Sequence, residues 1–232
     1  MTAASSNHTP AALNRAHWQR LQRIYRSAGW PCQDALELDL LAAGLLERIT
    51  TAGGQVFLQP SSAGLVALHD QRRRNQATRS RHDELVQRVA EQLAMEGRIA
   101  YAELPLRAKP GARWLQLRPD VFSIRHTTHT DALAPMVHEI KTTRADLLGD
   151  LRRPDKRAGY RALAGCCYYV IAEGIADASE IPEECGVLQT EGERLRLLRT
   201  APRAPVTLDF GTWMALARAT PVPVAPDPQA AL

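Results

Sequence analysis

Two acidic residues and a lysine have the types and spacing that suit metal-assisted chemistry on phosphate esters. Asp120 follows Pro119 in the run RPDVFSI, and Glu139 and Lys141 flank Ile140 in the run VHEIK. Alternate residues of a β-strand share one face, so Glu139 and Lys141 point the same way while Ile140 can enter the core. A carboxylate and an ammonium are therefore expected side by side.

These residues predict a divalent-metal site if the two segments are neighbouring strands. Asp120 would then reach the same edge as Glu139, and two carboxylates a few ångströms apart repel unless a cation lies between them. Mg²⁺, or Mn²⁺ in its place, suits such a site because Mg²⁺ commonly takes one or two carboxylates plus a substrate phosphate. The backbone carbonyl of Ile140 is available as a further ligand. Lys141 would stabilise the attacking hydroxide or the charge that grows on the phosphate.

A helix and three strands are predicted up to Lys141. Residues 82–96 have apolar side chains at helical spacing, and Gly97 closes the helix. The β-type segments that follow cover residues 99–106, 114–124 and 136–141. The turn sequence KPG at residues 109–111 predicts that the first two form a hairpin.

Helices and a buried strand are predicted after Lys141. Thr142 or Thr143 can cap a helix that reaches about residue 151, and Pro154 breaks or restarts it before a helical stretch over residues 155–163. Residues 166–172, CCYYVIA, are almost wholly apolar, as a strand buried on both faces requires. The predicted fold class is therefore α/β, in the order helix, three strands, helix, strand.

The two motifs resemble the half-motifs of the PD-(D/E)xK nuclease superfamily. Within it, RPDVFSI, VHEIKTTRADLLGDLRRPDKRAGYRALAGCCYYVIA and IPEECGVLQTEGERLRLLRTAP look like the MmcB-related bacterial DNA repair proteins, over residues 83–202. The resemblance implies a restriction-endonuclease-like core, divalent-metal dependence and a role in DNA repair or processing. The chain departs from the family by a short insertion over residues 151–154 and by Ala164-Gly165, where the family tends to carry Cys-Asp. The best-matching residues are Asp120, Glu139, Lys141, Thr142, Asp146, Asp150, Lys156, Tyr160 and Tyr168.

Further candidate residues lie on the predicted helices. This superfamily often supplies one more acidic metal ligand from the helix before the strands, which favours Glu84, with Glu91 as a rival and a solvated glutamate as the plain alternative. On the helix after Lys141, i,i+4 spacing joins Lys156 to Tyr160 and Arg157 to Arg161. These side chains are candidates to contact substrate phosphates and a base. An amphipathic helix is the alternative for them.

Three other polar residues near the motifs carry weaker expectations. Asp146 and Asp150 are one helical turn apart and could hold a second cation or orient Lys156, but solvent exposure is favoured. His138 would face away from Glu139 on the strand and is expected to be a core or edge residue.

The chain before residue 82 predicts a separate module. Helical periodicity over residues 18–28 and again from residue 34, then the turn Gly53-Gly54 beside a β-type run, resembles a winged-helix domain. The predicted organisation is a flexible tail at 1–12, a winged-helix-like domain at 13–70, a basic linker at 71–81, a nuclease-like domain at 82–218 and a Pro-rich tail at 219–232. Arg72, Arg73 and Arg74 in the linker are candidates for tracking phosphates, and a solvated helix face is the plain alternative.

Composition sets only weak limits on partner and compartment. The 232 residues carry a formal charge of +4 and have a pI near 9.1, a mild basic bias that is compatible with a polyanionic partner. The four cysteines lack zinc-binding or C-x-x-C spacing and are expected to be reduced. With no secretory signal and no long apolar run, we expect a cytoplasmic protein that does not contact membranes.

Together these patterns predict a magnesium-dependent nuclease that hydrolyses DNA phosphodiester bonds. The alternatives are a non-catalytic DNA-binding protein that uses the nuclease fold as a platform, and a transcriptional regulator that reads DNA with its N-terminal module. The last is weakened because Asp34, Glu37 and Asp39 on the expected reading helix would repel phosphates. A double-strand cut usually takes two active sites, so a homodimer is also considered.

Overall fold

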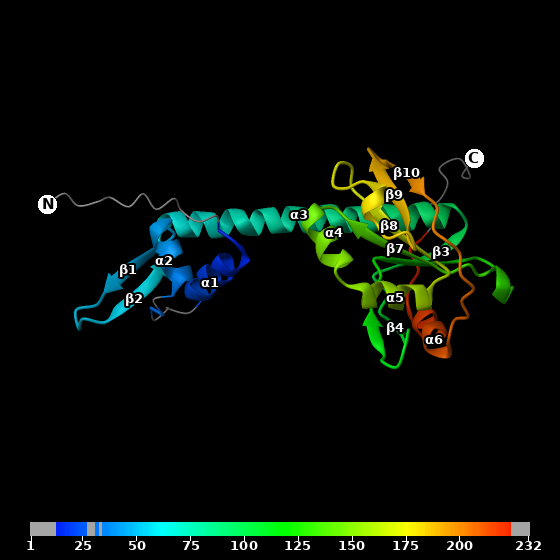
Figure 1. Cartoon of the computed structure of the whole chain (residues 1–232), viewed down its shortest axis with the longest axis horizontal. Coiled ribbons are helices and arrows are strands. Elements are labelled where there is room, and N and C mark those ends of the chain that lie inside the picture. The colour runs from blue at the N-terminus through cyan, green and yellow to red at the C-terminus, as the bar shows by residue number, and fades with distance from the viewer. Residues whose placement is uncertain (1–12, 27–30, 33, 224–232) are drawn as a thin grey trace. The chain divides into compact units, whose positions relative to one another are not determined.

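The chain divides into two compact units, Met1–Ala77 and Thr78–Leu232. The structure, a computed structural model, describes residues 13–26, 31–32 and 34–223 (Figure 1). The tail predicted at residues 1–12 lies outside the described residues. A single long helix, α3 (Ser62–Met95), contributes its first part to one unit and its second part to the other.

The first unit is a small helical module with one β-hairpin. Helices α1 (Arg15–Arg26) and α2 (Ala35–Ala42) precede the antiparallel strands β1 (Leu46–Thr50) and β2 (Val56–Pro60), and the start of α3 follows. Its core is formed by apolar side chains from all five elements, which are Leu21, Ile24, Leu40, Leu46, Leu58 and Leu68. The module predicted over residues 13–70 therefore has the expected helices and hairpin.

The basic linker predicted at residues 71–81 is helical. These residues lie inside α3, so the helix predicted from residue 82 begins twenty residues earlier, at Ser62. The run QRRRNQATRSR contains no glycine or proline to stop a helix, and its arginines are solvated on the surface. Arg79 and Asp83 are also 3.8 Å apart at i,i+4 spacing. The boundary between the two units, after Ala77, lies within the predicted linker, and its arginines form the solvated helix face that was the plain alternative for this run.

The second unit is built on a six-stranded mixed sheet in the order β10-β9-β8-β7-β6-β3. Strands β3 (Arg98–Ala102), β6 (Val121–Arg125) and β7 (Met136–Lys141) are antiparallel neighbours. The crossover from β7 through α4 (Arg144–Leu151) and α5 (Pro154–Leu163) makes β8 (Cys166–Ile171) parallel to β7. Thr143 caps α4 by accepting from the backbone N–H of Asp146, as predicted.

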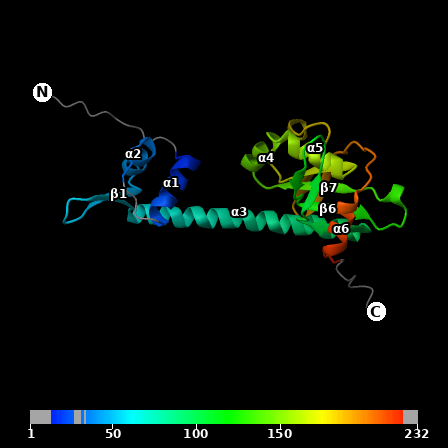
Figure 2. The same cartoon turned by 90° about the horizontal axis from the view of Figure 1, so that it is seen from below.

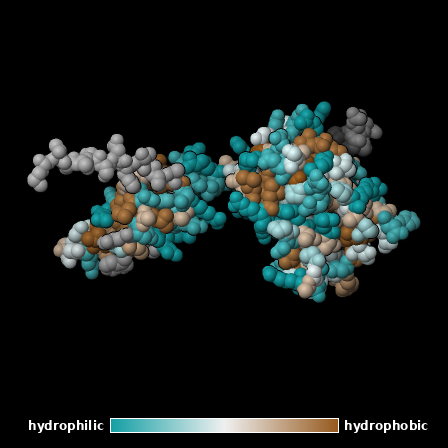
Figure 3. All heavy atoms as spheres, viewed as in Figure 1, coloured by the Kyte–Doolittle hydropathy of each residue, from teal (hydrophilic) through white to brown (hydrophobic). Residues whose placement is uncertain are grey.

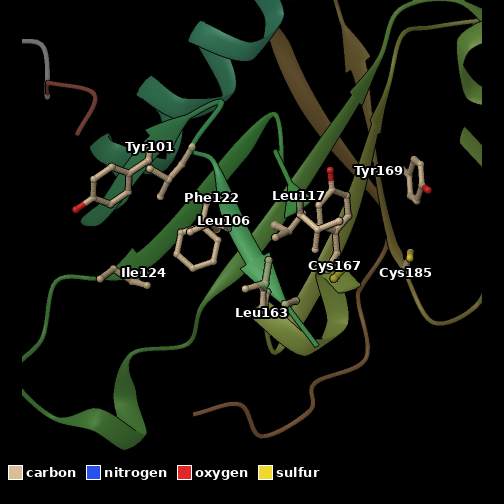
Figure 4. Packing of buried hydrophobic residues seen from close by; sticks show 14 of the residues in the cluster. Tyr101, Leu106, Leu117, Phe122, Ile124, Leu163, Cys167, Tyr169 and Cys185 are labelled. Atoms are coloured by element: carbon tan, nitrogen blue, oxygen red, sulfur yellow. The ribbon is translucent and has the colours of Figure 1, made fainter. Parts of the chain in front are cut away.

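Helices cover both faces of this sheet, so the unit is a three-layer α/β structure (Figures 1 and 2). The second part of α3 packs with Val89 and Leu93 on one face, against Val121, Ile140 and Val170 of the central strands. Helices α4 and α5 pack on the other face together with α6 (Phe210–Arg218). Figure 4 shows this second core, whose buried side chains include Phe122, Leu163 and Tyr169.

The two long strands predicted at residues 99–106 and 114–124 are each broken in two. The outer parts form a separate ribbon, β4 (Leu106–Ala108) and β5 (Leu115–Leu117). Glu103 has φ 49°, a left-handed conformation that ends β3, and its N–H donates to the Asp120 carbonyl at 2.9 Å. Asp120 therefore sits in the bend just before β6 rather than at a strand centre, next to Pro119, which cannot donate to a ladder.

The C-terminal part of the sheet was not predicted as strands. Strand β9 (Gly186–Glu191) pairs parallel with β8 and antiparallel with β10 (Arg194–Arg199). Strand β10 is an edge strand, and Arg194–Leu197 alternate polar and apolar side chains, a signal from which this strand could have been predicted. The start of the predicted Pro-rich tail is also anchored, because Val222 N donates to Ala100 O at 2.8 Å.

Hydrophilic side chains cover much of the molecular face drawn in Figure 3. Within the described residues, none of the helices combines the length and the apolar character needed to cross a lipid bilayer. No disulfide joins the four cysteines, which all belong to the described part of the chain.

The contact between α5 and the ribbon gives a test of the packing. A Cβ on Gly159 would lie 2.6 Å from Leu117 Cδ1, whereas a Cβ on the helical Gly149 would meet no atom within 4 Å. We expect Gly159→Val to lower the free energy of unfolding by about 1–3 kcal/mol through overpacking. The matched change Gly149→Val should stay within about 0.5 kcal/mol of the wild type. Chemical denaturation measures both, and equal effects would refute the close approach of α5 to β5.

Candidate active site at the end of strand β7

Glu139 and Lys141 lie side by side at the carboxyl end of β7, as the strand period predicts. Lys141 Nζ donates to Glu139 Oε1 at 2.7 Å, and both side chains are 5% exposed. They occupy the sheet face that α4 and α5 cover, whereas Ile140 packs against α3 on the opposite face. The predicted carboxylate–ammonium pair is therefore present and buried.

Asp120 joins this pair from the neighbouring strand. Its Oδ2 accepts from the backbone N–H of Ile140 at 2.6 Å. The carbonyl of Lys141 accepts from Ala172 N on the β8 side, and adjacent residues of a strand turn their backbone groups to opposite sides. The Ile140 carbonyl is therefore turned toward the side of Asp120, where it can contribute a further oxygen.

A second lysine and a second carboxylate complete the cluster. Lys156 Nζ of α5 contacts Glu139 Oε1 and donates to Asp150 Oδ1 at 2.6 Å. Tyr169 of β8 donates its hydroxyl to Asp150 Oδ2 at 2.7 Å. The sequence favoured solvent exposure for Asp150, which was wrong: α4 turns this residue inward over the sheet, where it orients Lys156. Asp146 is 55% exposed and lies 3.5 Å from Lys141 Nζ.

Burial and charge act against each other in this cluster. Burial raises the pKa of Glu139, and the nearby Asp120 raises it further, while Lys141 and Lys156 pull it down. Burial opposes the charge of Lys141, but Glu139 and Asp150 outweigh it and raise the pKa of that amine. At neutral pH Lys141 is therefore a proton-bearing cation and cannot serve as a base.

His82 is a member of the site that the sequence did not reveal. It lies on α3 with Nε2 3.5 Å from Asp120 Oδ2, and its hydrogen bond to Asp120 raises the pKa of its ring to about 9. Glu84, the acidic residue expected here, is instead exposed and accepts from Ser80 Oγ at 2.9 Å. Glu91 accepts from Gln87. The helical pattern placed this segment beside the strands but did not say which side chain turns toward Asp120.

The residues proposed to contact DNA are placed in different ways. Lys156 is engaged in the cluster, Tyr160 is buried and donates to Arg118 O at 3.3 Å, and Arg157 donates to Leu151 O at 2.8 Å. Arg161 is exposed on α5. Within the first unit, Arg72, Arg73 and Arg74 are exposed on α3, and the Arg72 guanidinium lies 5.8 Å from the centre of the Tyr25 ring.

His138 has the structural placement that its strand position predicts. It is buried on the face opposite Glu139, and its ring stacks on Tyr168 with centroids 5.3 Å apart. Burial, helped by the Arg98 cation, lowers the pKa of the ring to about 3. A neutral histidine locked in this way belongs to the core and not to the charged cluster.

Asp120, Glu139 and the Ile140 carbonyl are the groups of this cluster that could hold a metal ion. Among the described residues, no three or more histidines, cysteines, aspartates and glutamates are grouped so as to hold a metal. Glu139 Oε2 is nevertheless buried with no hydrogen-bond partner, beside the Asp120 carboxylate that perturbs it. Two carboxylates and a backbone carbonyl match the few protein ligands that magnesium uses when a phosphate and waters fill the remaining positions.

Comparison with known proteins does not extend this description. No family model and no curated protein matches the chain. Among solved structures, a protein of unknown function from Silicibacter pomeroyi is similar, with a TM-score of 0.42 and 21% sequence identity, covering 57% of this chain and 79% of that one.

The burial of Asp150 predicts a large effect of its removal. We expect Asp150→Asn to lower the free energy of unfolding at neutral pH by roughly 3 kcal/mol, because two buried ammonium groups lose a counter-charge. The cations Lys141 and Lys156 outweigh burial and hold the pKa of Asp150 below its usual 3.8. Its stabilisation is therefore present above about pH 4 and is lost as the pH falls through the folded pKa.

The comparison with Asp146→Asn isolates this effect. The control removes an exposed carboxylate from the same helix and should cost no more than about 0.5 kcal/mol. Thermal unfolding of both variants between neutral and acidic pH gives the comparison. Equal destabilisation by the two substitutions would contradict the inward placement of Asp150.

The contact between His82 and Asp120 predicts a shifted titration. We expect the His82 ring to titrate near pH 9, and near its ordinary 6.5 in Asp120→Asn. Because the folded pKa is raised, the contact stabilises the protein fully below the unfolded value and loses this effect as the pH rises through 9. Nitrogen-resolved NMR of the ring measures the titration. Asp83 also lies 3.3 Å from the ring, at Nδ1, but it is 58% exposed, so Asp83→Asn should lower the titration by less than Asp120→Asn does. An unmoved titration in Asp120→Asn would disprove the contact.

Proposed function

We propose that this protein is a metal-dependent nuclease that hydrolyses DNA phosphodiester bonds in DNA repair or processing, with a restriction-endonuclease-like core. One observation carries the proposal: Asp120, Glu139 and Lys141 meet at the carboxyl end of a central strand, with Glu139 Oε2 buried and unpartnered. Open α/β sheets use this end of their strands for ligands. The motif resemblance from sequence agrees with this chemistry.

The ligands proposed for Mg²⁺ or Mn²⁺ are Asp120, Glu139 and the Ile140 carbonyl. When bound, the ion neutralises the two carboxylates, polarises the phosphate and lowers the pKa of a coordinated water. The exposed Glu84, paired with Ser80, is not needed in this set. The protein holds Asp120 in place through the Ile140 N–H, so this carboxylate is oriented before substrate arrives.

Lys141 is assigned to the phosphate. The negative charges of Glu139 and Asp150 raise the pKa of this amine, so it stays protonated. It therefore stabilises negative charge that grows on the phosphoryl oxygens. Asp150 and Tyr169 position Lys156 beside the same Glu139 oxygen. Lys156 is therefore a positioning residue, which keeps the Glu139 side chain from rotating away from Asp120.

We assign the N-terminal module to contact with another protein, which includes a second copy of this chain in a homodimer, rather than to reading DNA bases. Its acidic residues are paired with cations or a histidine: Arg20 binds Asp34 and Glu37, and His17 lies 2.9 Å from Asp39. This pairing reduces the repulsion of phosphates that the sequence suggested. The exposed positions of α2 are nevertheless Ala35, Leu38 and Ala42, which lack the basic and amide side chains of a winged-helix DNA reader.

A non-catalytic DNA-binding protein is the second candidate. It is favoured by the double pairing of Glu139, since Lys141 and Lys156 together already compensate its charge. This function predicts salt-sensitive DNA binding without cleavage when Mg²⁺ or Mn²⁺ is added.

A plasmid-nicking assay tests the catalytic proposal. We expect nicking with Mg²⁺ or Mn²⁺ that EDTA abolishes, and a loss of about a hundredfold or more in Asp120→Asn, Glu139→Gln and Lys141→Ala. Glu84→Gln, which changes an exposed carboxylate paired with Ser80, should keep wild-type activity. Thermal unfolding confirms that each variant is folded. If wild type and all three variants nick equally, the cleavage comes from elsewhere and the proposed site is wrong.

A further inference from the structure

The ribbon of β4 and β5 carries a surface that the proposed cleavage site does not use. Residues 106–118, LRAKPGARWLQLR, contain four basic residues and no acidic one. Trp114 stands at the end of the ribbon loop and is 49% exposed. The Arg107 guanidinium lies over its ring, 5.1 Å from the centroid. An exposed tryptophan beside a guanidinium provides an aromatic surface next to a positive charge.

A groove lies between this ribbon and α6. Its volume is about 720 Å³, and its walls include Leu106, Arg107 and Trp114 on one side and Met214 and Arg218 on the other. The volume falls within the roughly 300–1,000 Å³ of ligand sites, so there is room for a base and its sugar. Met214 is 43% exposed and provides a further apolar surface.

The charge of the groove favours an anionic occupant. Among its described lining residues, Arg107 and Arg218 are positive and Asp209 is negative. Asp209 is already used as the N-cap of α6, where its Oδ1 accepts from Thr212 N at 2.6 Å. Lys109 and Arg113 are exposed on the adjoining loop. An aromatic platform surrounded by cations is the chemistry that recognises single-stranded nucleic acid.

We propose that the β4–β5 ribbon and α6 form a second nucleic-acid site, which binds an unpaired DNA strand with a base stacked on Trp114 and phosphates on Arg107, Lys109 and Arg113. A base inside a duplex has both faces covered by its neighbours, so Trp114 can stack only on a base that has left the helix. The site therefore favours single strands, forks or flaps over continuous duplex. Its link to cleavage rests on the proposed function, whereas its binding does not.

The ribbon is tied directly to the charged cluster. Tyr160 of α5 donates to Arg118 O, and Arg118 is two residues before Asp120 in the chain. Leu117 packs against Gly159, one residue from Tyr160. A strand held on the ribbon is thus held by the same segment of chain that carries Asp120.

Fluorescence anisotropy in EDTA tests the binding without cleavage. The probes are a labelled oligothymidylate of about 16 nucleotides and a duplex of equal length. We expect the wild type to prefer the single strand and Trp114→Ala to weaken that binding by about 5- to 150-fold, with a much smaller effect on the duplex. Trp114→Phe should restore most of the affinity. Lys109→Ala with Arg113→Ala should reduce the dependence of binding on salt.

Phe210→Ala is the matched control, because Phe210 is 78% exposed on α6 and does not line the groove. It should bind as wild type does. Unchanged affinity of Trp114→Ala for the single strand would overturn the proposal and leave the groove to a protein segment. Equal losses on single strand and duplex would also overturn it.

The same variants separate this inference from the proposed function. Asp120→Asn should bind the single strand normally in EDTA while failing to nick DNA. If neither the wild type nor any variant nicks DNA but Trp114→Ala still binds the single strand more weakly than the wild type, the nuclease proposal fails and this site stands. If nicking of forked and plain substrates depends on Asp120 but not on Trp114, and Trp114→Ala binds the single strand as the wild type does, this site fails and the nuclease proposal stands.

Discussion

The Glu139 carboxylate, buried between two ammonium groups at the end of β7, is the constraint on which the second unit depends. A buried carboxylate is costly unless its charge is compensated, and here the compensation comes from Lys141 on the same strand and Lys156 on α5. Lys156 in turn requires Asp150 of α4, which requires the Tyr169 hydroxyl of β8. The crossover helices are therefore held over the sheet edge by polar groups as well as by the apolar core.

Stability alone does not account for this arrangement. Apolar side chains in place of the three carboxylates and two lysines would stabilise the same fold at least as well. Desolvated ion pairs seldom contribute more stability than well-packed apolar side chains of similar volume. Concentrated and opposed charges with displaced pKa values are typical of sites that bind or activate a ligand. One oxygen of Glu139 has no partner in the described protein, so the cluster is complete electrostatically but incomplete in hydrogen bonding, and a ligand can use that oxygen.

The bend between β5 and β6 links the cluster to the surface ribbon. Pro119 lies in this bend, and Glu103, in a left-handed conformation, lies in the matching bend between β3 and β4. Asp120 is outside the sheet ladder there, and its carboxylate accepts from the Ile140 N–H. The same bend projects Trp114 and the basic loop away from the sheet. A single irregularity in two otherwise regular strands therefore positions both the candidate metal ligand and the candidate binding surface.

The sequence by itself determined the parts that local periodicity controls. The strand period fixed Glu139 and Lys141 on one face with His138 and Ile140 on the other, the cap fixed the start of α4, and apolar runs fixed β7 and β8. Only the tertiary structure decided that His82 faces Asp120, that Asp150 is buried and that the long strands break at Asp120. Each of these depends on contacts between residues distant in the chain or on a backbone bend, and neither leaves a periodic signal in the sequence.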